Sequence, residues 1–330
     1  MTRRASSIFH LLPWAVLILS VRFTLGCADP DGPQPALAHN PPEEKADDSL
    51  LAYLNPKTLY LRSDVALVMD DEAGRVLFEK NVHEQRPIAS LTKLMTAMVV
   101  LDAGLPGDEV VTITRVDRDR LRGSDSRLSF GTKLTRRDLL KIALAGSDNR
   151  AAAALGRTYP GGAGRLVATM NAKARRLGMT ETVFEDAAGL RDGNLSTAAD
   201  LVTLMEAASH YPFIRTFTTI KTDYVTDRRT GWKIRFVNTN RLVRNSRWEI
   251  DLSKTGYIAA SGHCLMMRAE IADRPVTVVL LNSWGTLTKY GDANRIRTWC
   301  DRAEKKAQAA ARALHASAIP TSSGSAARLR

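Results

Sequence analysis

Residues 86–97 read Arg86-Pro-Ile-Ala-Ser90-Leu-Thr-Lys93-Leu-Met-Thr-Ala97, and an apolar run continues from them through residue 101. This pattern predicts a buried helix that starts near Ser90. Positions three apart on a helix lie on the same face. The spacing therefore predicts that the Ser90 hydroxyl and the Lys93 amine face each other at the N-terminal end of that helix.

The pairing of Ser90 with Lys93 matters because a serine hydroxyl attacks poorly until a base removes its proton. Lysine is normally protonated and cannot be that base. Burial at the positive end of a helix, with another cation nearby, lowers a lysine pKa until the neutral amine is available. The same helix end stabilises negative charge that develops on a substrate oxygen. Alone, Ser-x-x-Lys is a weak signal, because it occurs by chance on many helices.

Two further motifs follow along the chain. Ser147-Asp-Asn149 lies at a predicted turn that leads into a helix of small residues, and Lys254-Thr-Gly256 lies at the start of a predicted strand. The ordered set Ser-x-x-Lys, Ser-Asp-Asn and Lys-Thr-Gly is the signature of penicillin-binding proteins and class A β-lactamases. The alternative is three chance tripeptides, and the correct order and context disfavour it.

Longer stretches around these motifs resemble the low-molecular-mass penicillin-binding proteins, the D-alanyl-D-alanine peptidases of family S11. The stretches are 147–178, 189–190, 194–201 and 254–265, and the resemblance covers about residues 64–284. Within the family, the chain is most similar to the endopeptidase branch, the penicillin-binding protein 7 type. The resemblance implies that the partners are peptidoglycan stem peptides, with β-lactam antibiotics as covalent inhibitors.

The resemblance also implies acyl transfer at these motifs. Ser90 would attack the carbonyl carbon of a D-alanyl peptide bond while Lys93 takes its proton. Ser147 and Lys254 would then relay or supply a proton to the leaving amine. Taken without the resemblance, Ser147 could simply cap the helix that follows it.

The remaining site residues would hold the substrate. Asn149 would hydrogen-bond the substrate backbone, and the Thr255 hydroxyl would orient the substrate. The backbone N–H groups of Ser90 and Tyr257 would form the oxyanion hole. The predicted catalytic residues are Ser90, Lys93 and Ser147, and the predicted substrate-binding residues are Asn149, Lys254, Thr255, Gly256 and Tyr257.

The order of predicted elements indicates an α+β fold. The first and last strands would pair into one antiparallel sheet flanked by helices, with an inserted helical subdomain, as in the β-lactamase and DD-peptidase-like transpeptidase fold. Predicted strands are 65–69 and 75–79, joined by a turn at 71–74, then 109–113, 224–226, 232–236, 254–258, 263–271 and 276–281, the last two joined by a turn at Arg274-Pro275. Predicted helices are 139–145, 149–155, 162–177, 197–209 with Ser196 as its cap, and 292–314.

The N-terminal residues predict export. Residues 1–28 have two early arginines and an apolar run too short to span a membrane, which is typical of a signal peptide. Thr24-Leu-Gly-Cys27 partly resembles a lipoprotein site. Three fates of Cys27 therefore stay open: it is removed with the signal peptide, it is lipidated, or neither happens. The chain is predicted to reach the periplasm, with possible anchoring at Cys27 and loose envelope association. A flexible linker at 29–58, a catalytic domain at 59–315 and a disordered tail at 316–330 complete the predicted organisation.

Composition narrows the function further. The net charge of +12 serves solubility or helps to hold an acidic polymer such as the cell wall. We find no aromatic-basic motif of a nucleic-acid-binding module, so no nucleic acid is predicted. The histidines lack His-Glu-x-x-His spacing, so no metal or other cofactor is predicted. Three cysteines are too few for a disulfide scaffold, and Cys264 with Cys300 either pair or stay as buried thiols.

Several activities fit the signature. A class A β-lactamase needs a Glu-x-x-Asn element between the second and third motifs, and no glutamate there has Asn three residues on. A membrane-anchored D-alanyl-D-alanine carboxypeptidase would carry a second β domain and an amphipathic anchor, and residues 301–308 are too polar for one. We therefore expect an endopeptidase that cuts D-alanyl–meso-diaminopimelyl cross-links, with the carboxypeptidase as the alternative. The three intact motifs disfavour a non-catalytic wall-binding protein.

Overall fold

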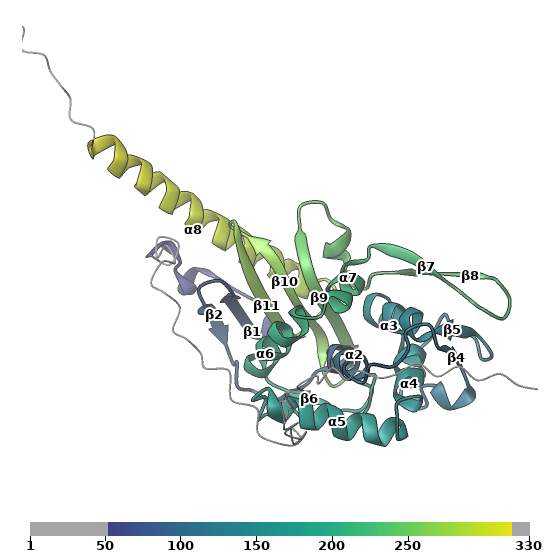
Figure 1. The fold of residues 1–330 in the computed structure, drawn as a ribbon. Coiled ribbons are helices and arrows are strands. Elements are labelled where there is room, and N and C mark those ends of the chain that lie inside the picture. The colour runs from purple at the N-terminus through teal and green to yellow at the C-terminus, as the bar shows by residue number, and fades with distance from the viewer. Residues whose placement is uncertain (1–51, 319–330) are drawn as a thin grey trace, which may run out of the picture. The chain divides into compact units, whose positions relative to one another are not determined.

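The computed structural model describes residues 52–318 of the chain (Figure 1). The predicted signal peptide at 1–28 and residues 29–51 of the predicted linker lie outside the described residues, as do residues 319–330 of the predicted tail. The described part includes a short 3₁₀ turn near its start, η1 (Pro56–Thr58), and ends with a long helix, α8 (Thr288–Ala318). None of the helices within it is long and apolar enough to cross a bilayer.

A five-stranded antiparallel sheet forms the framework, with the strand order β2-β1-β11-β10-β9. The predicted N-terminal hairpin is confirmed as β1 (Ser63–Asp70) and β2 (Arg75–Lys80). The three strands near the other end of the chain are β9 (Glu249–Ile258), β10 (Gly262–Ile271) and β11 (Arg274–Ser283). Because β1 pairs with β11, the two ends of the domain close one sheet, and the predicted α+β arrangement is confirmed.

The sheet is buried on both faces because its side chains alternate between two apolar clusters. Val65 and Leu67 of β1 pack with the inserted helices, whereas Ala66 and Val68 pack with Ile296 and its neighbours on α8. Figure 1 shows α8 along one side of the sheet and the other helices on the opposite side. The middle of each central strand is therefore mostly apolar.

The helical subdomain is inserted between β2 and β9, as predicted. At its centre, α2 (Lys93–Asp102) is buried from Lys93 to Val100, and its residues are accordingly mostly apolar on all faces. The subdomain also contains α7 (Pro212–Thr219) and the strands β3 (Arg86–Pro87), β5 (Lys133–Thr135) and β6 (Leu195–Ser196), which we did not predict. The helices are α2 (Lys93–Asp102), α3 (Arg136–Ala145), α4 (Asn149–Arg157), α5 (Gly162–Arg176), α6 (Ala198–Ser209) and α7 (Pro212–Thr219). The two-stranded pairs are β3 (Arg86–Pro87) with β6 (Leu195–Ser196), β4 (Val110–Thr112) with β5 (Lys133–Thr135), and β7 (Thr222–Thr226) with β8 (Lys233–Val237).

Local geometry corrects three predicted boundaries. Ser90 lies in a 3₁₀ turn, η2 (Ala89–Thr92), and the α-helix begins only at Lys93. Ala89, the first residue of this turn, has a φ of 47°, outside the α-helical region, so an α-helix cannot extend back through it. The cap of α6 is Thr197, whose hydroxyl accepts from a backbone N–H in the first turn. The last hairpin turns at residues 272–273, both with positive φ, as a two-residue hairpin of matching twist requires.

The two cysteines of the domain are free thiols. Cys264 lies in the cluster on the helical face of the sheet, whereas Cys300 lies in the cluster under α8. The sheet therefore separates them, and the alternative of two unpaired buried cysteines is correct.

The helix α8 is fastened to the sheet by Asp292 in its second turn. The Asp292 carboxylate is fully buried and accepts from the Ser63 backbone N–H at 2.7 Å and the Ser63 hydroxyl at 2.6 Å. It also accepts from the Arg62 backbone N–H at 3.1 Å. This carboxylate therefore satisfies the donors at the start of β1, beside the strand end that closes the sheet.

We predict that Asp292→Asn lowers the free energy of unfolding by about 2–4 kcal/mol, because an amide leaves a buried donor at Ser63 without its acceptor. Urea unfolding followed by tryptophan fluorescence measures this change. Asp301→Asn is the matched control. The ion pair that Asp301 forms with Arg297 at 3.6 Å is partly exposed to water, so its loss should cost at most about 0.5 kcal/mol. Equal losses in both variants would contradict the prediction.

Candidate active site

The three sequence motifs meet beside the edge strand β9. The Lys93 Nζ donates to the Ser90 Oγ at 2.8 Å and to the Asn149 Oδ1 at 2.7 Å. The Lys254 Nζ donates to the Ser147 Oγ at 2.8 Å. Two hydroxyls and two amines thus lie in one site, although the motifs are separated by more than 50 residues along the chain.

Lys93 is the most constrained group of the site. Its side chain is 1% exposed, and its Nζ also donates to the Ala188 carbonyl oxygen at 2.7 Å. Burial lowers the pKa of Lys93 to about 7, although the carboxylates of Asp186, Asp148 and Asp119 oppose this shift from a distance. A neutral amine is therefore available near pH 7, within hydrogen-bonding reach of the Ser90 hydroxyl.

Lys254 forms a second buried amine with its own hydroxyl. Its Nζ donates to Ser147 and to the Thr255 carbonyl oxygen at 2.9 Å. Burial and the positive charges of Lys93 and Lys289 hold the pKa of Lys254 well below its ordinary value. This amine can therefore pass a proton to and from Ser147 at modest cost.

Ser147 does not cap α4. The cap is Asp148, whose carboxylate accepts from the Ala151 backbone N–H at 2.9 Å. Ser147 has a φ of 55°, in the left-handed region that serine rarely occupies. The chain holds this strained residue at the turn so that its hydroxyl faces Lys254, and the alternative of an ordinary helix cap is wrong.

The strand β9 supplies the remaining predicted residues. Thr255 is buried, and its hydroxyl donates to the Thr239 Oγ1 at 2.7 Å. A Cβ atom on Gly256 would lie 3.1 Å from the Ser90 nitrogen, so glycine lets the strand approach the Ser90 turn closely. Tyr257 is 58% exposed, and its ring stacks on His263 with centroids 4.3 Å apart. The Tyr257 side chain therefore lies at the rim of the site.

The loop 186–194 belongs to the site and was not predicted. The Asp186 carboxylate accepts from the backbone N–H groups of Ala188 at 2.7 Å and Gly189 at 2.6 Å, which aims the Ala188 carbonyl at Lys93. A Cβ atom on Gly189 would lie 1.8 Å from the Ala89 oxygen, so this loop presses directly on the Ser90 turn. The sequence shows the Asp-x-x-Gly turn, but it does not show that the Ala188 carbonyl of this turn contacts Lys93, 95 residues away.

A second loop, 119–124, orients Asn149. The Asp119 carboxylate accepts from the Ser124 hydroxyl at 2.6 Å, and the Ser124 Oγ accepts from the Asn149 Nδ2 at 2.7 Å. This chain of contacts keeps the Asn149 oxygen directed at Lys93. Neither Asp119 nor Ser124 was predicted as a site residue, because neither belongs to the three motifs.

A pocket of about 390 Å³ opens onto Ser90. Within residues 52–318, no group of three or more histidine, cysteine or acidic side chains could hold a metal ion. The arrangement offers a hydroxyl nucleophile, a neutral amine and a second amine–hydroxyl pair, which suit acyl transfer. The pocket is lined by Ser90, Leu121, Arg122, Ser124, Asn149, Gly189, Leu190, Tyr257, Ile258 and Ala259.

Comparison with known proteins agrees with this chemistry. Residues 54–285 match the family described as D-alanyl-D-alanine carboxypeptidase, peptidase S11. The chain is 44% identical over 251 residues to a D-alanyl-D-alanine endopeptidase of Pseudomonas aeruginosa, across 76% of this chain and 81% of that protein. A D-alanyl-D-alanine endopeptidase of Escherichia coli is 42% identical over 73% of this chain and 78% of that protein.

A solved structure shows the same fold. Penicillin-binding protein D2 of Listeria monocytogenes, determined in its cefotaxime-bound form, has a TM-score of 0.65 and 31% sequence identity. The match covers 74% of this chain and 98% of that one. The predicted DD-peptidase-like fold is therefore confirmed, and so is the resemblance inferred from the motifs. The chain belongs to peptidase family S11, the D-alanyl-D-alanine carboxypeptidase family, and within it is similar to the endopeptidases.

Proposed function

We propose that the chain is a serine DD-peptidase that cuts D-alanyl–meso-diaminopimelyl cross-links of peptidoglycan through an acyl-enzyme on Ser90. One observation carries the proposal: the buried Lys93 Nζ lies 2.8 Å from the Ser90 Oγ, with a pKa lowered to about 7. A lysine with an ordinary pKa would be charged at neutral pH and could not accept the Ser90 proton.

In the first half of the reaction, the Ser90 Oγ forms a bond to the D-alanyl carbonyl carbon while the Lys93 amine takes the hydroxyl proton. The carbonyl oxygen becomes an oxyanion, which the backbone N–H groups of Ser90 and Tyr257 would stabilise. Loss of one such donor typically costs about 3 kcal/mol of transition-state stabilisation. The close approach of β9 at Gly256, where an added Cβ atom would lie 3.1 Å from the Ser90 nitrogen, supports this pairing of strand and turn.

In the second half, the bond between the carbonyl carbon and the leaving nitrogen breaks. The leaving amine receives a proton through the Ser147 hydroxyl, whose Oγ accepts a hydrogen bond from the Lys254 Nζ at 2.8 Å. Lys93 passes on the proton that it took from Ser90, which replaces the one supplied through Ser147, so that its amine is neutral again. Water then attacks the carbonyl carbon of the acyl-enzyme and gives a proton to the Lys93 amine. The bond to the Ser90 Oγ breaks, that oxygen takes the proton back from Lys93, and the D-alanyl acid is released. Asn149 and Thr255 would hold the substrate backbone along β9 during both steps.

The preferred bond distinguishes the two leading activities. The 44% identity to the Pseudomonas aeruginosa endopeptidase supports cleavage of cross-links. The family description, D-alanyl-D-alanine carboxypeptidase, supports the alternative of trimming pentapeptide stems. The cefotaxime-bound relative from Listeria monocytogenes supports β-lactams as covalent inhibitors that acylate Ser90. A β-lactamase or a non-catalytic wall-binding protein is less favoured.

The proposed substrate requires that the protein itself is exported from the cytoplasm. Peptidoglycan lies outside the cytoplasm, so we place the mature chain in the periplasm, loosely associated with the envelope. The signal-like residues 1–28 support this placement, and Cys27 could be lipidated or removed. Globomycin, which blocks cleavage of lipoprotein signal peptides, would cause a precursor to accumulate only if Cys27 is lipidated.

We predict that acylation of Ser90 by benzylpenicillin speeds up about tenfold between pH 6 and pH 8. Only the neutral Lys93 amine accepts the proton, and with a pKa of about 7 the neutral fraction falls tenfold per pH unit below that value. Rapid-quench labelling from pH 5.5 to 8.5 measures the rate, and circular dichroism at each pH verifies the fold. A rate independent of pH across this range would show that Lys93 is not the base.

We predict that the purified chain splits cross-linked muropeptide dimers faster than it releases D-alanine from pentapeptide monomers. Liquid chromatography with mass spectrometry of both digests gives the two rates. Ser90→Ala should abolish both products, because it removes the nucleophile but leaves the fold intact. Release of D-alanine with cross-links left whole would refute the endopeptidase assignment in favour of the carboxypeptidase.

A further inference from the structure

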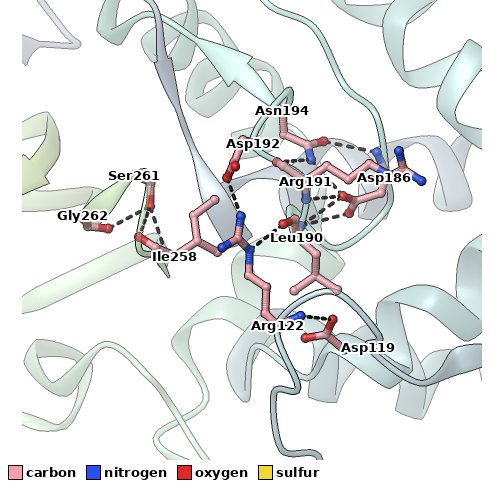
Figure 2. Close-up of polar contacts among 10 residues, drawn as sticks. All are labelled: Asp119, Arg122, Asp186, Leu190, Arg191, Asp192, Asn194, Ile258, Ser261 and Gly262. Carbon is pink, nitrogen blue, oxygen red and sulfur yellow. Dashed lines mark hydrogen bonds and ion pairs between the residues drawn. The ribbon is translucent and has the colours of Figure 1, made fainter.

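Arg122 forms one wall of the pocket that opens onto Ser90, and the motifs do not account for it. Its Nε donates to the Leu190 carbonyl oxygen at 2.7 Å, and its Nη2 pairs with the Asp192 carboxylate. Figure 2 shows the side chain reaching from the 119–124 loop across to the 186–194 loop. The pair therefore bridges the two loops that position Asn149 and the Ala188 carbonyl.

Both ends of this bridge are held rigidly. The Asp119 carboxylate accepts from the Arg122 backbone N–H at 3.0 Å. On the opposite loop, the Asp186 carboxylate accepts from the Leu190 backbone N–H at 3.0 Å and from the Asn194 Nδ2 at 2.9 Å (Figure 2). The backbone at Arg122 and the loop residues on both sides of Asp192 are thus held by carboxylates of their own loops.

The Arg122 guanidinium has capacity for another ligand. It carries five N–H donors, and the two contacts with Leu190 and Asp192 use two of them. Its third nitrogen points toward Ile258, which lines the same pocket from the end of β9 (Figure 2). Asp192 is 63% exposed, so its carboxylate can also accept from a ligand.

We propose that Arg122 and Asp192 form a subsite for the free end of the meso-diaminopimelyl residue in the acyl half of the substrate. That end carries a carboxylate and an ammonium on the same carbon. Arg122 would bind the carboxylate through its remaining N–H donors, and the exposed Asp192 carboxylate would bind the ammonium, so the substrate adds two ion pairs beside the one within the protein. This inference rests on the proposed function and names the part of the substrate that the pocket recognises.

A purely structural role explains the arrangement less well. The Arg122 side chain is 28% exposed and its partner 63% exposed, and ion pairs this open to water add little stability. Backbone hydrogen bonds to Asp119 and Asp186 already hold both loops. A charged pair at the mouth of the pocket therefore suits binding of a substrate better than stabilisation of the two loops.

Matched ester substrates test the subsite. Two stem peptides end in D-alanyl-D-lactate, and they carry either meso-diaminopimelate or lysine as the third residue. Lysine keeps the amine and lacks the carboxylate. The ester is more easily cleaved than an amide, and both peptides release the same D-lactate, so any preference for a leaving group cancels in the ratio of the two rates. The ratio of kcat/KM for the two esters measures the preference for the carboxylate.

We predict that the wild-type chain prefers the meso-diaminopimelyl ester about tenfold to a hundredfold, the range expected for a charged hydrogen bond. Arg122→Gln should abolish this preference by slowing only the meso-diaminopimelyl ester, and Arg122→Lys, which retains the charge, should keep part of it. Arg127→Gln is the matched control, because Arg127 donates to the Arg235 carbonyl at 2.8 Å outside the pocket lining. Arg127→Gln should retain the full ratio.

Each other outcome has a defined meaning. Equal wild-type rates on the two esters, or an Arg122→Gln variant that slows both esters by the same factor, would overturn the subsite and leave the proposed function standing. A wild-type chain that hydrolyses neither ester and splits no cross-linked dimer would refute the proposed function itself. Thermal denaturation of each variant verifies folding, and if Arg122→Gln does not fold, the ratio measured for Arg122→Lys decides.

Discussion

The site depends on burying the Lys93 amine without giving it a carboxylate to pair with. All three oxygens that accept from its Nζ are neutral, and they belong to Ser90, Asn149 and Ala188. A carboxylate in direct contact would stabilise the ammonium form and remove the base. The nearby acids instead accept hydrogen bonds from other groups, as Asp186 does from the backbone of its own loop. The acids that shape the site are thereby kept one contact away from the amine.

This constraint also explains the unusual backbone around the site. A carbonyl oxygen can reach Lys93 only if the 186–194 loop presses against the Ser90 turn, and only glycine at position 189 permits that approach. Gly256 plays the same part for β9 on the other side of the turn. Ala89 and Ser147 both take left-handed φ values, which cost free energy that the surrounding packing must supply. The strained residues are therefore the one before the nucleophile Ser90 and Ser147 itself, whose backbone sets the direction of the second hydroxyl.

Local pattern was enough to predict the sheet, the main helices and the order of the three motifs. The continuous apolar run of β1 and the hairpin turn before β2 depend on neighbouring residues, so the sequence contains them directly. The start of α2 was placed too early because the sequence does not distinguish the 3₁₀ turn at 89–92 from a first turn of α-helix. The contact between Arg122 and Leu190 was missed because 68 residues separate the two, and neither loop shows any periodicity. Contacts between loops that are far apart in the sequence can be predicted only once the fold is known.

The two buried amines also determine the direction in which protons can move. Burial lowers the pKa of Lys254, and the positive charge of Lys93 lowers it further, so protonation of one amine disfavours protonation of the other. When Lys93 takes the Ser90 proton, the proton on the Lys254 side becomes easier to release, and Ser147 lies 2.8 Å away to pass it on. The burial that makes Lys93 a base therefore also makes the neighbouring pair an acid at the moment the leaving amine needs a proton. One physical cause, an amine withdrawn from water beside another, serves both halves of the reaction.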